Sequence, residues 1–291
     1  MTKLPEELHH ILGEVAHPSP LFRNKKEMSL KDIQTVSLGI MTVIDEFCQR
    51  NHINYSLGYG ALIGAVRHKG CIPWDDDIDI IITRPEYQKL LKLFNDDEKV
   101  SLGGVKLYAP ELGNSYFPIA RICDMKRTKV HKYSQWTDEY TGVWIDVFVI
   151  DSMPNNIDKM RVLLRNCFKA CVGHVKFSTE ISLKNNLKNF KRKLLYSHLD
   201  RRVLINSYLD EVSKIVWNST SEVCNLCSPY HSDIHKKNLF DKYIRVQFED
   251  KELSIIASYD EYLRNIYGNY MQLPPIEKRV RGHVSHTYLW V

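Results

Sequence analysis

From Trp74 to Ile82 the chain reads Trp-Asp-Asp-Asp-Ile-Asp-Ile-Ile-Ile, and this run gives the clearest indication of the fold. From position 77, aspartate and isoleucine alternate, and successive side chains of a strand point to opposite faces of the sheet. The pattern therefore predicts a strand over 77–82 with its aspartates on one face. Crowded carboxylates repel one another unless a cation neutralises them or water solvates them. The carboxylates concerned belong to Asp75, Asp76, Asp77 and Asp79.

Asp77 and Asp79 have the spacing of a paired metal site. Alternate positions on a strand lie about 6.6 Å apart, and side chains on one face can converge on one cation or on two. Carboxylate oxygens are the hard ligands that Mg²⁺ or Mn²⁺ prefers, and magnesium commonly links protein carboxylates to substrate phosphates. The rival interpretation is an acidic surface turn, but an exposed turn does not normally alternate aspartate with isoleucine.

A glycine turn precedes this strand. Residues 53–57 predict a short strand, Gly58 and Gly60 interrupt it, and a short helix is expected to begin over 61–66. Glycines let the backbone approach a phosphate, and the free N–H groups of a helix N-terminus attract the anion, although such turns often serve only to reverse the chain. The cations that are candidates for phosphate contact, with solvated surface charge as the rival interpretation, are Arg67, His68, Lys69 and Arg121.

The remaining periodicities predict an α+β fold. Two helices, near 30–50 and over 84–94, each follow a capping-box pattern, and further strands are expected, the last of which carries Asp146. We predict a mixed sheet flanked by helices over 1–154 as the catalytic core, followed by a mainly helical region over 155–291. The capping boxes consist of Ser29 with Asp32 and Thr83 with Glu86, and the further strands span 102–108, 119–123 and 143–150.

The bulk composition is that of an ordinary globular protein. The chain has 291 residues, of which 44% are hydrophobic and 26% charged, and a net charge of +5. This charge is too small to argue for nucleic acid but suits polyanionic substrates. The N-terminus lacks the apolar core of a signal peptide, and no window approaches about 18 consecutive apolar residues. We therefore expect a cytoplasmic protein, in which the seven cysteines are reduced.

The run from Gly58 to Ile80 closely resembles the LicD family of phosphocholine transferases, which is related to fukutin and fukutin-related protein. The resemblance rests on Gly-Ala-Val-Arg-His-Lys-Gly at 64–70 and Ile-Pro-Trp-Asp-Asp-Asp-Ile-Asp at 72–79. It extends to the strand with Asp146 and to the segment 267–275, and is weaker over 155–240. That family implies a nucleotidyltransferase fold of the polymerase-beta type, with a glycine turn, an Asp-x-Asp strand and a third carboxylate on a neighbouring strand.

The resemblance assigns roles to particular residues. It makes Asp77 and Asp79 the paired metal ligands and catalytic residues, Asp146 the third carboxylate, and Asp75 a further candidate ligand. Asp146 could be a general base or only a ligand, and both roles stay open. The glycine turn departs from the Gly-Gly-Ser or Gly-Gly-Thr of relatives, since it is Gly-Tyr-Gly-Ala at 58–61, so one hydroxyl that could bond a phosphate is missing.

The implied reaction is an in-line displacement at phosphorus that depends on Mg²⁺ or Mn²⁺. The donor would be CDP-choline or another CDP-alcohol, and the acceptor a glycan or lipid-linked glycan precursor of teichoic acid, lipopolysaccharide or capsule, reached from the cytoplasm at the inner face of the membrane. The alternative is nucleotidyl transfer to RNA or a small molecule, but a charge of +5 with no arginine-aromatic tract argues against nucleic acid. A catalytically idle scaffold would normally have lost a metal aspartate.

Four further features have two interpretations each. The resemblance suggests that the C-terminal tail folds back so that Arg279 and His283 touch substrate, whereas a plain basic tail is the alternative. Trp74, with Trp136 and Trp144, could form an aromatic cage for a quaternary ammonium or belong to the core. The basic stretch 184–202 could lie against anionic lipid or be a solvated helix face. Zinc ligands, although too closely spaced for a zinc finger, could be Cys224, Cys227, His231 and His235.

Overall fold

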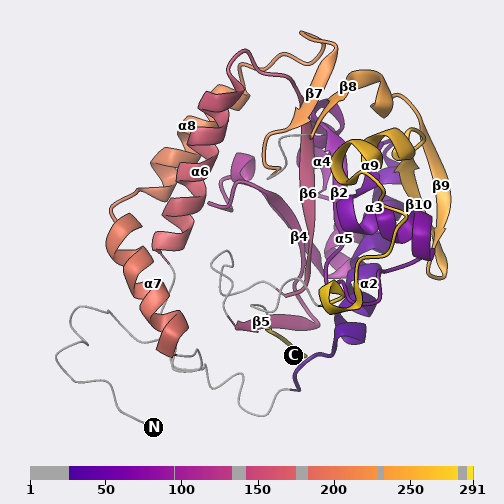
Figure 1. Cartoon of the computed structure of the whole chain (residues 1–291), viewed down its shortest axis with the longest axis horizontal. Helices are drawn as coiled ribbons and strands as arrows, with labels where there is room; N and C mark the ends of the chain where they lie inside the picture. The colour runs from indigo at the N-terminus through magenta and orange to yellow at the C-terminus, as the bar shows by residue number, and fades with distance from the viewer. Residues whose placement is uncertain are drawn as a thin grey trace.

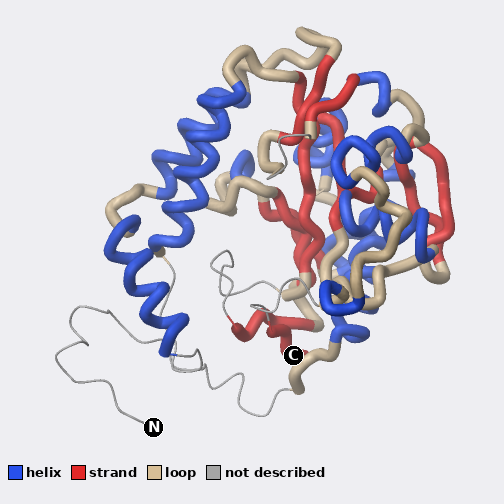
Figure 2. The backbone as a smooth tube through the Cα atoms, viewed as in Figure 1, coloured by secondary structure: helices blue, strands red, loops and turns tan. Residues whose placement is uncertain are grey.

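A computed structural model describes residues 26–94, 96–132, 142–174, 183–228, 233–280 and 287–290. In Figure 1 a twisted sheet runs through the middle of the molecule, with one group of helices on its right and a layer formed by α6, α7 and α8 on its left. Figure 2 shows the same division by secondary structure. The expected mixed sheet flanked by helices is therefore confirmed.

The central sheet has the strand order β1-β2-β6-β4-β3, and β7 pairs with both β6 and β8. Strands β2 and β6 are parallel, and the other pairs are antiparallel. β4 pairs with the first half of β6 and β7 with its last residues, so both lie along the same edge of β6. The strands are β1 (Ser56–Gly58), β2 (Asp79–Thr83), β3 (Val105–Tyr108), β4 (Ala120–Asp124), β6 (Trp144–Ser152), β7 (Glu222–Asn225) and β8 (Ile234–Lys236).

Helix α2 begins at a side-chain cap. Ser29 and Asp32 form the predicted capping box, in which each side chain bonds the backbone N–H of the other, and this pairing satisfies N–H groups that a helix start leaves open. The short helix after the glycine turn continues as one π-helical turn over Gly64–His68. The α-helices are α2 (Leu30–Arg50), α3 (Tyr59–Ile63), α4 (Arg84–Leu93), α5 (Glu98–Gly103), α6 (Ile157–Gly173), α7 (Leu183–Tyr196), α8 (Arg201–Val212) and α9 (Tyr259–Tyr267).

Two local predictions are wrong. Thr83 precedes α4 but makes no side-chain cap, and Glu86, the other member of the predicted capping box, accepts a hydrogen bond from the backbone N–H of Asn54 at 3.1 Å. The strand predicted from 77 begins at Asp79, where the pairing with β1 and β6 starts. Asp77 therefore belongs to the loop before the strand. Ile80, Ile81 and Ile82 are all buried, so neither face of this strand is open to solvent there.

Beyond residue 155 three α-helices follow one another as far as Val212, and α9 is the one α-helix described after them. Strands β7 and β8 then return to the central sheet, so segments from both sides of residue 155 share one sheet. Two small antiparallel pairs complete the described fold. They are the hairpin of β9 (Tyr243–Phe248) and β10 (Lys251–Ile256), and the pair of β5 (Thr128–Lys132) with β11 (Thr287–Trp290).

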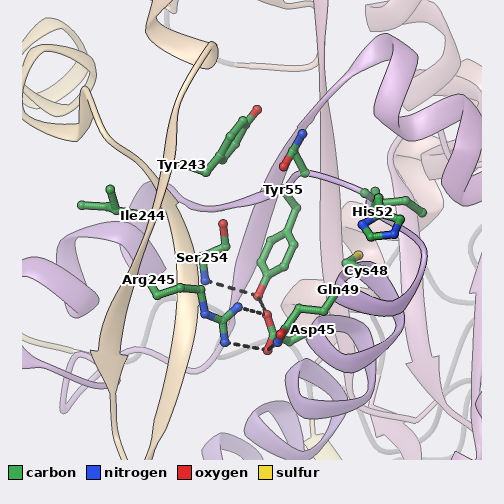
Figure 3. A pocket seen from close by; sticks show the side chains of 11 residues that line it. Asp45, Cys48, Gln49, His52, Tyr55, Tyr243, Ile244, Arg245 and Ser254 are labelled. Atoms are coloured by element: carbon green, nitrogen blue, oxygen red, sulfur yellow. Dashed lines mark hydrogen bonds and ion pairs between the residues drawn. The ribbon is translucent and has the colours of Figure 1, made fainter.

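A charged pair attaches the β9–β10 hairpin to α2 (Figure 3). Arg245 of β9 donates to both carboxylate oxygens of Asp45, at 2.5 and 2.8 Å, and the hydroxyl of Tyr55 donates to the same carboxylate at 2.6 Å. Burial and the Asp45 charge raise the pKa of Tyr55 well above its ordinary value, so this hydroxyl stays a donor. These groups line an open pocket of about 320 Å³. Because the sheet strand β1 runs from Tyr55 toward Gly58, the pair also anchors the far end of the strand that carries the glycine turn.

Candidate active site

The register of the sheet places the predicted chemistry in one row. Gly58 pairs with Asp79, Asp79 pairs with Asp146, and Asp146 pairs with Arg121. Residues directly opposite one another on neighbouring strands are separated by about 4.8 Å and project to the same face. The glycine turn, two carboxylates and a guanidinium, all far apart in sequence, are therefore consecutive neighbours across four strands.

A second carboxylate group lies in the loop before β2. Asp75, Asp76 and Asp77 each offer an oxygen, and these atoms lie within 4.8 Å of one another; in the described part of the chain this is the one group of three or more acidic, histidine or cysteine side chains so arranged. Gln34 of α2 fixes the loop, because its amide donates to the carbonyl oxygen of Asp75 at 2.9 Å. The four predicted metal ligands therefore fall into two sets. Asp75 and Asp77 lie in the loop group, and Asp79 and Asp146 form a pair on neighbouring strands.

Asp76 is the residue that sequence reasoning left out of the metal set. Its side chain is buried, and it lies within the same oxygen group as its two neighbours. Strict alternation along a strand would have turned it away from Asp75 and Asp77, but this segment is a loop. The unbroken run of three aspartates was the available signal.

The two glycines allow the turn to approach the acidic loop and β2. A Cβ on Gly60 would lie 2.6 Å from Oδ2 of Asp75, and a Cβ on Gly58 would lie 2.9 Å from a methyl carbon of Ile81. Real Cβ atoms do not come so close. The glycine turn is therefore packed against the carboxylate loop that follows it in sequence.

Arg121 is the partner of Asp146. Its Nε donates to Oδ1 of Asp146 at 2.8 Å, while the indole N–H of Trp144 donates to Oδ2 at 3.2 Å. The guanidinium lies between two rings, 3.9 Å from the centroid of Phe117 and 4.6 Å from that of Trp144. Stacking and burial keep Arg121 in one orientation, so it orients the third carboxylate. Trp144 likewise orients this carboxylate through its indole N–H. Trp136, the other tryptophan considered for an aromatic cage with Trp74, lies outside the described residues.

Some of the predicted substrate-binding residues gather beside the π-helical turn. The Arg67 guanidinium donates to the carbonyl oxygen of Tyr270 at 2.5 Å, which holds the C-terminal segment against this turn. The guanidinium of Arg279 lies 5.6 Å from the Trp74 ring, and His68 packs edge-on against the same ring at 6.0 Å. Desolvation, and secondly the charge of Arg67, lower the pKa of His68, so this imidazole is neutral near pH 7.

Other predicted residues have different positions. Lys69 ends the π-helical turn with a left-handed φ of 58°, and its side chain is exposed. His283 and His231 lie outside the described residues. His235 does not offer a free nitrogen, because Nε2 contacts Asp233 at 2.9 Å and Nδ1 contacts the Asn265 amide at 3.2 Å. Burial raises the pKa of Cys224 and Cys227 to about 12, and among the described residues these thiols do not form a metal-ligand group with His235.

A buried polar network supports the glycine turn from behind. Tyr59, between the two glycines, has a left-handed φ of 43°, and its hydroxyl donates to Oδ2 of Asp233 at 2.5 Å. Asn225 of β7 donates to the same hydroxyl, and His235 of β8 lies against the other oxygen of Asp233. Strands from the second half of the chain thereby hold the turn in place. Nothing in the local sequence around Tyr59 indicated these partners.

Residues 52–159 hold the glycine turn, both carboxylate groups and Arg121, and they match the family described as LicD/FKTN/FKRP, nucleotidyltransferase domain. Over these residues the chain therefore carries a domain similar to that of the LicD family. It is similar to the Lipopolysaccharide cholinephosphotransferase LicD of Haemophilus influenzae, with 26% identity over 276 residues that cover 91% of this chain and 99% of the relative. An uncharacterized protein of Rickettsia typhi is 41% identical over 58 residues, 19% of each chain.

Proposed function

We propose that this protein is a metal-dependent phosphotransferase that moves phosphocholine, or a related phospho-alcohol, from a CDP-activated donor onto a cell-surface glycan precursor. The observation that carries the proposal is the row from Gly58 through Asp79 and Asp146 to Arg121, beside the Asp75–Asp77 loop. The similarity over nearly the whole length to a relative named a lipopolysaccharide cholinephosphotransferase supports phosphocholine and a lipopolysaccharide-type acceptor. Teichoic acid and capsule precursors are the other acceptors of this chemical class.

The carboxylates fit the Mg²⁺ or Mn²⁺ that the family implies. Three hard oxygen ligands lie within 4.8 Å of one another, and the missing side chain of Gly60 leaves room at Asp75. We propose that Asp75, Asp77, Asp79 and Asp146 hold the cation, with Asp76 as an additional member of the loop group. Such a cation supplies charge neutralisation at the phosphates.

The chain's own residues would then orient the reactants. The backbone of the glycine turn can approach a phosphate closely, and the cations Arg67 and Arg279 lie at the rim of the same region, beside Trp74. A carboxylate held by Arg121 and Trp144 is fixed in direction, which suits Asp146 either as a ligand or as the acceptor of the attacking hydroxyl's proton. Positioning of this kind accounts for much of the rate in phosphoryl transfer.

The acceptor chemistry implies the place of action. A CDP-alcohol donor and a lipid-linked glycan precursor meet at the cytoplasmic face of a membrane, and we propose that the protein works there from the cytoplasm. Within the described residues, no helix combines the length and the apolar character that a membrane span requires.

The decisive experiment uses purified protein, Mg²⁺ and a panel of CDP-choline, CDP-ethanolamine, CDP-glycerol and CDP-ribitol. We expect CMP release from one donor, stimulated by lipopolysaccharide or another glycan acceptor, and its loss in Asp77→Asn and Asp79→Asn. Asp158→Asn, whose carboxylate is 90% exposed on α6, is the matched control and should keep full activity. Nucleotide addition to RNA or a small molecule, without CMP release from any CDP-alcohol, would replace the proposal with nucleotidyl transfer.

A further inference from the structure

Helix α7 turns its apolar side outward. Leu187 is 61% exposed, Leu194 is 72% exposed and Leu195 is 46% exposed, whereas the polar Asn189 is only 8% exposed. A helix on the surface of a globular protein normally does the reverse, with its apolar stripe against the core. The sequence of this helix is amphipathic, but its three exposed leucines are not packed in the core.

The outward residues form one stripe that also carries basic side chains. Leu187, Lys191, Leu194 and Leu195 follow one another at the spacing of four, three and one residues that places them on a single helix face, and exposed Lys188 borders it. Over Leu183–Tyr196 the helix has five lysine or arginine residues and no aspartate or glutamate. The stripe, which we call the α7 face, is defined by Leu187, Lys188, Lys191, Leu194 and Leu195.

The opposite side of α7 is attached to the protein body. A Cβ on Gly173, the last residue of α6, would lie 2.5 Å from the backbone of Tyr196, so the ends of the two helices touch. The ammonium of Lys169 lies 5.8 Å from the Tyr196 ring. The α7 face is therefore presented by a docked helix.

We propose that the α7 face is a docking surface for a bilayer that contains anionic lipids. Leucines that project from a helix lying flat can enter the boundary between headgroups and acyl chains, while lysines on the same helix contact lipid phosphates. The charge of α7 is complementary to such a surface along its whole length, because no carboxylate interrupts it. A protein partner would need a matching acidic and apolar groove, and is the alternative that the test below rejects or supports.

The position of α7 gives the docking a use. In Figure 1, α7 lies at the lower left, at the end of the molecule opposite β7. Because β7 pairs with the last residues of β6, this lower end is the one where β6 begins and where Asp146 lies. A membrane at α7 would bring a lipid-carried acceptor to the same end as the carboxylates. This consequence rests on the proposed function, whereas the docking itself does not.

The test is sedimentation of the full-length protein with vesicles, without nucleotide or acceptor. Vesicles of phosphatidylethanolamine with phosphatidylglycerol should bind the protein, and pure phosphatidylcholine vesicles should not. The double variant Leu187→Ser with Leu194→Ser should weaken binding at least about tenfold, because it removes the inserting side chains. Lys188→Glu with Lys191→Glu should weaken it by a similar factor and abolish the preference for anionic lipid.

Matched variants separate this surface from general effects. Val216→Ser changes an apolar residue that is 66% exposed outside α7, and Lys251→Glu reverses a charge on the β9–β10 hairpin at the other side of the molecule (Figure 1). Both should bind vesicles like the wild type. Wild-type protein that stays in the supernatant with anionic vesicles, or control variants that lose binding equally, would overturn the proposal. Because no turnover is measured, this result is independent of the CMP-release assay.

Discussion

Asp79 and Asp146 are direct partners in the parallel pairing of β2 with β6. Parallel strands need a long connection, and here that connection contains β3, β4 and β5. The pairing puts two carboxylates side by side at the start of both strands, with the glycine turn on one side and Arg121 on the other. We propose that this pair and the Asp75–Asp77 loop both supply ligands to the cation.

Metal binding should depend on both groups. We expect Asp75→Asn and Asp79→Asn each to weaken Mn²⁺ binding at least about tenfold, because each removes one charged ligand. Isothermal titration or the Mn²⁺ paramagnetic resonance signal measures the affinity, with Asp158→Asn as the control. Unchanged Mn²⁺ affinity in both variants would show that the acidic loop and the strand pair are not metal sites.

Gly60→Ala should disable the site without unfolding the protein. The new Cβ would lie 2.6 Å from Oδ2 of Asp75, so the carboxylate must move by several tenths of an ångström or more. We expect CMP release to fall by about tenfold or more, since small displacements at a phosphoryl-transfer site have large effects. Gly39→Ala in α2, where the nearest neighbour is the end of the Arg127 side chain at 3.1 Å, is the control and should keep activity. Equal activity in the two variants would contradict the assigned role of Gly60.

Tyr59→Phe tests the buried network behind the glycine turn. It removes the hydroxyl that donates to Asp233 and accepts from Asn225, which leaves buried polar groups without that partner. We expect the free energy of unfolding to fall by about 1–3 kcal/mol, measured by urea denaturation, together with a fall in kcat. Tyr243→Phe, at a partly buried tyrosine on β9, should change neither quantity appreciably. A Tyr59→Phe protein with unchanged kcat and unchanged free energy of unfolding would show that the glycine turn does not need the network.

Arg245→Met should affect stability but leave activity intact. The substitution leaves the Asp45 carboxylate, whose side chain is 9% exposed, with the Tyr55 hydroxyl and without its main cation. Breaking a fully buried pair is more costly, but Arg245 is 37% exposed, so solvent screening reduces the loss to about 1–3 kcal/mol. Arg264→Met, at a pair exposed on both sides, should show no measurable change in urea. A large loss of CMP release in the folded Arg245→Met protein would contradict a purely structural role.

The imidazole of His68 should titrate below its ordinary pKa of about 6.5, because desolvation and then Arg67 oppose its protonation. The unfolded chain therefore binds a proton at His68 more strongly than the folded protein does. The contribution of His68 to the free energy of unfolding is complete above about pH 6.5, and it is lost as the pH falls through the lower pKa of the folded state. NMR titration of the ring gives the midpoint. Arg67→Met should raise that midpoint and Lys69→Met should not; a wild-type midpoint at or above the ordinary value would refute this assignment.

Local sequence was sufficient for several elements and insufficient for others. The capping box of Ser29 and Asp32 is made entirely within one helix start, so its prediction needed no tertiary information. Glu86 was expected to cap α4 in the same way, but a backbone N–H from Asn54 captured it. The prediction of a strand from residue 77 was wrong for a related reason. A strand extends only as far as neighbouring strands pair with it, and β1 and β6 pair with β2 only from Asp79 onward.

The order of glycine turn, acidic run and third carboxylate can be read from the amino-acid sequence alone, since each depends on residue types that are adjacent or regularly spaced in the chain. The hydrogen bonds of Arg121 with Asp146 and of Tyr59 with Asp233 became evident only from the tertiary structure. The same is true of the exposure of the α7 leucines. The physical reason is that hydrogen-bond partners and burial depend on which distant segments the sheet brings together. Periodicity shows that a helix has an apolar face, but only packing determines whether that face turns toward the core or away from it.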